Sequence, residues 1–228
     1  MRKSAKKILI CATALTMLLT ATACGQTGSG ATAVKTKGAV TEVSAPPTEQ
    51  EIYDAFSQLQ SGADADKTAE LRATMYSGLE TMDWDAYRRL GGGDPASEET
   101  RDKYESTGFA LLDYLAAQEY LSEDELTWLQ RGVLNHGIDG AYAEEYSTAL
   151  ANALENYPVF FCESLAYQSD RENMETYVIG DAVYGTYPES SISARLETMK
   201  KIVDSGYLDG DALAVGQAVV NKLENPVS

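Results

Sequence analysis

The chain has 228 residues, of which 35 are acidic and 18 are basic, and its formal net charge at pH 7 is −17. This excess of negative charge repels the phosphates of nucleic acids and anionic lipid head groups, so the composition excludes a nucleic-acid partner. The single histidine, His136, excludes metal centres built from several histidines, and we expect neither a metal nor another cofactor.

The first 23 residues have the layout of an export signal. Four basic residues and no acidic residue stand among the first seven, and residues 8–20 follow as an apolar run. A helix of this run is roughly 20 Å long at about 1.5 Å per residue, which is shorter than the ~30 Å hydrocarbon core of a bilayer. The pattern therefore predicts a signal peptide over residues 1–23 and not a permanent membrane span.

Small residues then lead to a cysteine in the sequence LTATAC, residues 19–24. This motif resembles the lipobox of bacterial lipoproteins, in which the cysteine becomes the first residue of the mature chain and carries acyl groups. The resemblance implies a protein held by membrane lipid through acylated Cys24, on the bacterial cell membrane and facing outside the cytoplasm. The family usually has leucine where this chain has Ala21, and residues 21–23 also fit ordinary secretory cleavage, which would release a free protein beginning at Cys24.

Residues 24–47 predict a lipidated cysteine followed by a disordered, flexible linker. The segment is small, polar and aperiodic, so it cannot bury enough apolar surface to fold. A flexible chain of this length spans about 25–30 Å, which would tether a domain a short way from the membrane. The first 23 residues hold four of the 18 basic residues and none of the 35 acidic ones, which leaves residues 24–228 with a formal charge of −21.

Residues 48–225 predict a single all-α domain of about nine helices, because helix-start signals recur and no alternating strand pattern is present. Thr48 and Glu51 form a capping box for the first helix. Further helices are expected over residues 64–79 and 84–90.

Three glycines make residues 91–94 a possible sub-boundary of the domain. The Asp-Pro pair that follows them predicts the start of a long helix over residues 94–120, since Asp is a favoured cap and Pro a favoured first helical residue. Ser122 and Glu125 predict a second capping box, for a helix that ends near residue 135.

The rest of the domain has five further helix starts, expected near residues 139, 158, 169, 192 and 209. Tyr142, Tyr146, Leu150 and Leu154 fall on one face of the first of these helices and predict its core side. Ser169 and Glu172 predict a third capping box, and residues 185–190 are expected to form a loop.

From residue 121 onward the helices are similar in length and their connections are short. This part resembles the stacked helical hairpins of HEAT-like and TPR-like proteins. The resemblance is clearest in the spacing Leu-x₃-Leu-x₃-Pro-x₂-Phe-x₃-Leu over residues 150–165. No fixed period repeats along the chain. A short right-handed α-solenoid-like stack and an irregular bundle therefore both fit the sequence.

No motif of a catalytic nucleophile, a phosphate loop or a dinucleotide site is present. Cys162 stands in an apolar helical context and is expected to be a small buried hydrophobe, although a chain freed by secretory cleavage could pair it with Cys24. His136 lies in a helix-ending turn, where a structural role is expected. The many carboxylates form chance pairs, so no catalytic residue is predicted.

Tyrosine is unusually frequent, with 14 residues against two tryptophans and four phenylalanines. Tyrosine is enriched at recognition surfaces because it combines a rigid ring with a hydroxyl group. Four tyrosines near helix ends and loops form the predicted recognition surface: Tyr177, Tyr184, Tyr187 and Tyr207. Core filling accounts for most of the others.

The leading hypothesis is a membrane-anchored extracytoplasmic lipoprotein with an acidic helical domain that binds a protein, a peptide or an envelope component. One alternative is a carboxylate-dependent hydrolase of the cell envelope, which requires two carboxyl groups in one groove, one of them with a shifted pKa. Another alternative is a spacer without a ligand. A groove that contains tyrosine favours binding, whereas a cleft with paired acids favours the enzyme.

Overall fold

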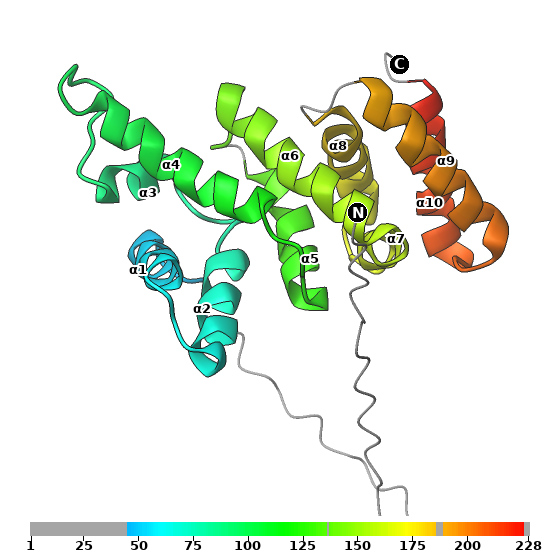
Figure 1. Ribbon diagram of the computed structural model, residues 1–228, viewed down its shortest axis with the longest axis horizontal. Helices are drawn as coiled ribbons and strands as arrows, with labels where there is room; N and C mark the ends of the chain where they lie inside the picture. Colours follow the sequence, from blue (N-terminus) through cyan, green and yellow to red (C-terminus); the bar gives the residue numbers. More distant parts are fainter. Residues whose placement is uncertain (1–44, 136, 186–188, 226–228) are drawn as a thin grey trace, which may run out of the picture. The chain divides into compact units, whose positions relative to one another are not determined.

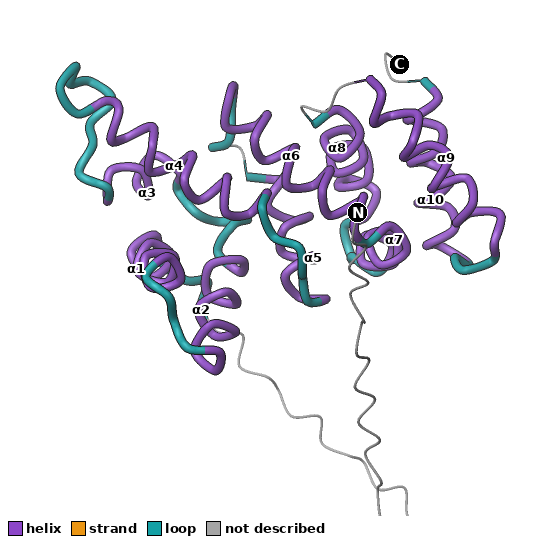
Figure 2. Tube along the Cα trace, in the orientation of Figure 1, coloured by secondary structure: helices purple, strands orange, loops and turns teal. Residues whose placement is uncertain are grey.

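The computed structural model describes residues 45–135, 137–185 and 189–225 (Figure 1). Within these ranges every regular element is a helix and no strand is present, so the predicted all-α class is confirmed (Figure 2). Several predicted features lie outside the described residues: the signal peptide, most of the linker including Cys24, and the single residues His136 and Tyr187. Residues 44–228 form one compact unit.

Nine of the ten described α-helices form two rows in which each helix packs on the next (Figure 1). The first row contains α3 (Trp84–Leu90), α4 (Arg101–Ala116), α6 (Gly140–Asn156) and α8 (Arg171–Tyr184). The second row contains α1 (Glu49–Gln60), α2 (Ala65–Ser77), α5 (Glu123–Arg131), α7 (Pro158–Ala166) and α10 (Gly210–Glu224). The tenth helix, α9 (Glu189–Ser205), packs on α10, and a 3₁₀ turn, Gly132–Leu134, follows α5.

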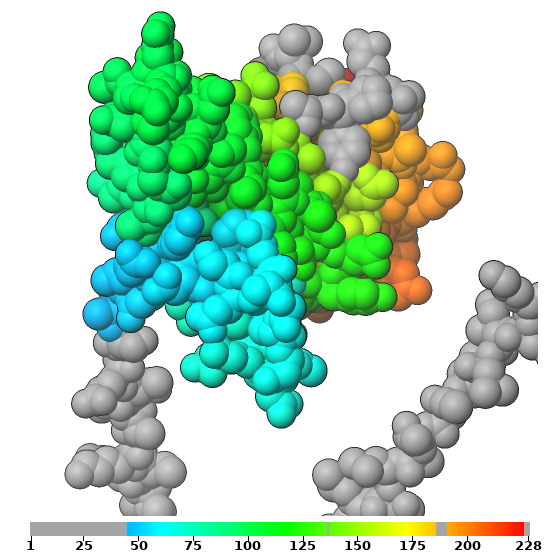
Figure 3. Space-filling view, turned by 60° about the vertical axis from the view of Figure 1, so that its left-hand side comes forward, coloured from blue at the N-terminus to red at the C-terminus, as the bar shows by residue number. Residues whose placement is uncertain are grey.

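The two rows pack on each other through apolar faces, as the predicted core residues show. Leu150 and Leu154 of α6 and Leu126 of α5 are buried in one shared cluster. Cys162 of α7 is fully buried in the same cluster, and burial raises the pKa of its thiol to about 12, so the thiol is protonated at neutral pH. The surfaces of α1 and α2 are continuous with those of the following helices (Figure 3).

Two of the predicted capping boxes are confirmed. In α1 the hydroxyl of Thr48 accepts a bond from the Glu51 amide at 3.3 Å, and the Glu51 carboxylate accepts one from the Thr48 amide at 2.8 Å. Ser122 and Glu125 make the same reciprocal pair at the start of α5, at 3.2 and 2.8 Å. These bonds satisfy amides that the helix itself leaves without acceptors.

The predicted start of the long helix at residue 94 is wrong, because α4 begins at Arg101 and ends at Ala116. The Asp94 carboxylate instead accepts a bond from the Ala96 amide at 3.0 Å and closes a local turn. The Asp94 amide donates to the Thr100 hydroxyl at 3.2 Å, which fixes the connection as a folded turn. Short side-chain bonds of this kind compete with helix formation.

The predicted capping box at Ser169 is also wrong, because Asp170 occupies the cap position of α8 and makes no capping bond. The Asp170 carboxylate binds Nη1 of Arg131 at 3.0 Å. An ion pair between distant parts of the chain thus replaces the expected local bond. The expected loop over residues 185–190 falls largely on residues 186–188, which lie outside the described residues, and α9 begins at Glu189.

None of the helices in the described ranges has the length and apolar character that a membrane span requires.

Two glycines inside helices, one in open space and one in a close contact, test how the helices pack on each other. A Cβ atom added at Gly180 in α8 meets nothing within 4 Å, so Gly180→Ala should stabilise the fold by roughly 0.5–1 kcal/mol through helix propensity. At Gly108 in α4 the Cβ would lie 2.6 Å from the Tyr142 ring and 3.0 Å from Cδ of Arg88, so Gly108→Ala should destabilise by about 1–3 kcal/mol. Urea unfolding measures both changes, and equal stabilisation by the two substitutions would contradict the packing of α4.

Candidate functional site

A groove of about 410 Å³ lies between α5 and α7, in the second row of helices. We call it the α5–α7 groove. Its size is within the range of about 300–1,000 Å³ that ligand sites occupy. It is lined by Glu123, Asp124, Thr127, Arg131, Phe160, Glu163, Ser164, Tyr167 and Gln168.

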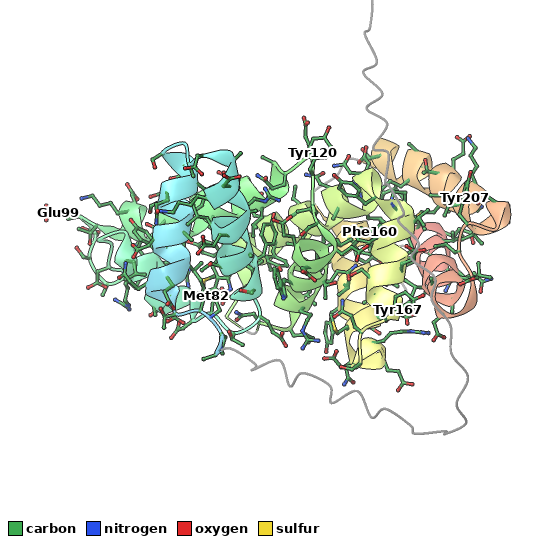
Figure 4. All side chains as sticks on the ribbon, turned by 90° about the horizontal axis from the view of Figure 1, so that it is seen from below. Met82, Glu99, Tyr120, Phe160, Tyr167 and Tyr207 are labelled. Atoms are coloured by element: carbon green, nitrogen blue, oxygen red, sulfur yellow. The ribbon has the colours of Figure 1, made fainter. Side chains whose placement is uncertain are left out.

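The amphipathic pattern of α7 places two aromatic rings at this groove. Phe161 and Leu165 are buried in the core, so the helical period leaves Phe160 and Tyr167 on another face (Figure 4). Phe160 is partly buried, whereas Tyr167, at the end of α7, is 83% exposed. Aromatic rings are frequent at binding sites because they offer a large, rigid contact area.

A fully buried glutamine, Gln130, fixes α7 against α5 beneath the groove. Its amide nitrogen donates to the carbonyl oxygen of Phe161 at 3.0 Å. Its amide oxygen accepts bonds from the Ser164 hydroxyl at 3.0 Å and from the Gln168 amide nitrogen at 2.9 Å. The carbonyl of Phe161 can only accept, so this contact fixes which end of the Gln130 amide is the oxygen.

This bonding pattern fixes the direction of the next hydrogen bonds. The Ser164 hydroxyl has one proton and donates it to Gln130, so in the 2.9 Å contact between Ser164 and Thr127 the proton comes from Thr127. Thr127 therefore faces the groove with lone pairs alone. The amide oxygen of Gln168 is buried and accepts no hydrogen bond within the described ranges. The hydroxyls of Thr127 and Ser164 in the groove thus leave only lone pairs, because their protons are used within the protein.

The one cation of the groove, Arg131, is engaged by carboxylates on other elements. Its Nε and Nη2 atoms each donate to Glu80 at 2.6 Å, and Nη1 donates to Asp170 at 3.0 Å. The bond to Glu80 is the main cause of a raised pKa at Arg131, which stays charged. Among the described residues, no salt bridge joins a cation to the three acidic groove residues, Glu123, Asp124 and Glu163. The groove therefore carries unpaired negative charge.

The amino-terminal end of α5 is held in place by an ion pair with α2. Arg72 donates to both oxygens of Glu125, with distances of 2.6 and 3.0 Å, and also to the carbonyl of Tyr120 at 2.8 Å. Burial acts to raise the pKa of Glu125, but the bonds from Arg72 and Ser122 lower it on balance. Glu125 is therefore an anion in the folded protein. Its ion pair with Arg72 fixes the end of α5 that carries the groove acids Glu123 and Asp124.

The structure places three of the four predicted recognition tyrosines on its surface. Tyr177 on α8 is 61% exposed, and Tyr207, between α9 and α10, is 74% exposed (Figure 4). The ring of Tyr184 lies 4.9 Å from the Lys222 ammonium group. None of these three lines the α5–α7 groove, and no ring contact among the described residues joins them. They stay a predicted surface, separate from the groove.

No expectation from the sequence included the residues that form the groove. One signal was present: four successive apolar residues, 159–162, cannot all face the core, because successive helical residues point about 100° apart. The spacing from Phe160 to Ser164 and Tyr167 then marks a second face of α7. The part played by Gln130 has no such signal, because it depends on contacts between two helices.

Comparisons with protein-family profiles, with curated proteins and with solved structures find no match for this chain. Over the part of the chain that the structure describes, no three His, Cys, Asp or Glu side chains are grouped so that they could hold a metal ion. The site is therefore interpreted from its own geometry and chemistry.

Asp181 on α8 is the described carboxyl group with a raised pKa, about 6, and the cause is burial. The folded state binds this proton more tightly than the unfolded chain, so the charged form costs stability as pH rises from about 4 through 6. Asp181→Asn should therefore stabilise the fold by about 1 kcal/mol at pH 7.5, a value reduced for partial solvent access, and should have little effect at pH 4. Thermal unfolding of both proteins across this range measures the difference. A stabilisation independent of pH would contradict this assignment.

Proposed function

We propose that this protein is a lipid-anchored extracytoplasmic module that binds its partner in the α5–α7 groove. The observation that carries the proposal is the combination in one groove of two aromatic rings, Phe160 and Tyr167, with three carboxylates that no described cation pairs. Binding sites commonly join apolar or aromatic walls to a few fixed polar groups, which orient the ligand. The partner would be a protein, a peptide or another component of the cell envelope.

The location of the protein in this proposal rests on the sequence of its amino-terminal segment. A basic head, a short apolar run and the LTATAC motif support cleavage before Cys24 and acylation of that cysteine. Acyl chains would hold the protein on the outer face of the membrane, and the linker up to residue 47 would let the domain reach partners about 25–30 Å away.

The groove favours binding over the two alternatives. Aromatic rings and unpaired carboxylates gathered in one hollow are typical of a binding site and have no role in a ligand-free spacer. A carboxylate-dependent hydrolase needs an acid of raised pKa among the groove carboxylates. The described acid with a raised pKa, Asp181, is on α8 and does not line the groove.

The anchor is tested by fractionation of cells that express the full chain. Wild-type protein should be recovered in the membrane fraction with an acylated amino terminus. Cys24→Ala should abolish acylation and release the mature domain or leave the signal uncleaved, whereas Cys162→Ala, the matched control at the other mature cysteine, should stay in the membrane fraction. Recovery of a cleanly cleaved wild-type chain in the soluble fraction would contradict the anchor.

Binding in the groove is tested by thermal shift of the full chain in neutral detergent. The panel contains muropeptides, neutral oligosaccharides and short basic, neutral and acidic peptides. A ligand at 100 times its dissociation constant should stabilise the protein by about 2.7 kcal/mol. This shift should be lost in the double variant Phe160→Ala and Tyr167→Ala and kept in Tyr207→Ala, which removes an exposed ring elsewhere. A shift that survives in the double variant, or a flat panel, would contradict a binding groove at α5 and α7.

A further inference from the structure

We propose that the occupant of the α5–α7 groove is a basic peptide segment, which places a lysine or arginine side chain between the two helices. This inference rests on the proposed function and adds the chemical class of the partner. It follows from three properties of the groove: the direction of its hydrogen bonds, the sign of its charges and the position of its aromatic rings.

The hydrogen-bond direction selects a ligand that donates. The chain of bonds from Thr127 through Ser164 to Gln130 uses the hydroxyl protons inside the protein, so lone pairs are left for a ligand. A carboxylate or phosphate, which mainly accepts, would meet these oxygens without forming bonds, whereas an ammonium or guanidinium group supplies three to five donors.

The charges select a cation. Glu123 and Asp124 start α5, and Glu163 comes from α7, so the carboxylates stand on both sides of the groove. Arg131, the cation among the lining residues, is neutralised by Glu80 and Asp170 outside it. The mature chain as a whole carries a large negative charge, which would speed the approach of a basic partner and repel an acidic one.

The aromatic rings select a side chain with an apolar stem. Phe160 precedes Glu163 by three residues on α7, and Tyr167, the residue that ends the helix, follows Glu163 by four. A lysine or arginine stem can pack on such rings while its charged end reaches the carboxylates, and a cation over a ring face is attracted by the ring electrons. A neutral sugar would stack on the rings and donate hydroxyl groups to the carboxylates, but it would leave their negative charge uncompensated.

The test uses the full chain in neutral detergent and a fluorescein-labelled short peptide with two lysines. The control ligand is the same peptide with both lysines acetylated, which keeps the size and removes the charge. Fluorescence anisotropy should show binding of the lysine peptide that weakens as salt rises, and acetylation should weaken it at least tenfold. Equal binding of the acetylated peptide would overturn the inference.

Charge-removing variants locate the site. Asp124→Asn and Glu163→Gln should each weaken binding of the lysine peptide about three- to tenfold. The control Glu99→Gln removes the same charge from an exposed position before α4 and should leave affinity unchanged (Figure 4). A loss at Glu99→Gln equal to that at Glu163→Gln would overturn the inference, because it would show attraction to the overall charge alone.

The experiments separate this inference from the function on which it rests. If the lysine peptide fails to bind but another ligand of the thermal-shift panel depends on Phe160 and Tyr167, the basic partner is wrong and the binding groove stands. If no ligand depends on these rings, both are wrong.

Discussion

The side-chain amide of Gln130 joins α5 to α7 where no solvent reaches, and the geometry of the candidate site depends on this contact. A buried amide that loses its partners costs about 1–3 kcal/mol, so the helices cannot slide without a penalty. The bonds of Gln130 to α7 and to Gln168, just beyond its end, set the distance between the helices and place Phe160 beside the acids of α5. They also fix the direction of the hydrogen bonds from Thr127 to Ser164 and from Ser164 to Gln130. The groove therefore favours a ligand that donates hydrogen bonds.

The second row of helices explains why a hollow forms at this place. Helices α5 and α7 have nine residues each and are shorter than α1, α2 and α10 on either side. Isolated helices of this length are marginal in water, so their stability comes from packing against the first row and from caps and ion pairs such as Arg72–Glu125. The inner faces are thereby committed to the core, and the outer faces are left to carry charge and exposed rings.

Much of the fold could be predicted because its signals are local. The capping boxes at Thr48 and Ser122 and the buried stripe of α6 need only residues a few positions apart. The predicted start of α8 was wrong because Asp170 binds Arg131, which lies 39 residues away in the sequence. The groove was not predicted for the same reason: Gln130 meets Phe161 and Gln168 only after two helices have packed. The abundance of tyrosine also directed the prediction to other surfaces.

Hydrogen–deuterium exchange of the full chain, with and without a saturating lysine peptide, shows directly whether the α5–α7 groove binds a basic segment. We expect slower exchange in two segments, residues 123–131 and 158–168, because a bound basic side chain would bridge the helices and reduce their local opening. Residues 191–199, which line a separate hollow beside α9, should exchange at an unchanged rate. Protection at residues 191–199, or no protection at α5 and α7 with peptide bound, would contradict the assignment of the binding site to this groove.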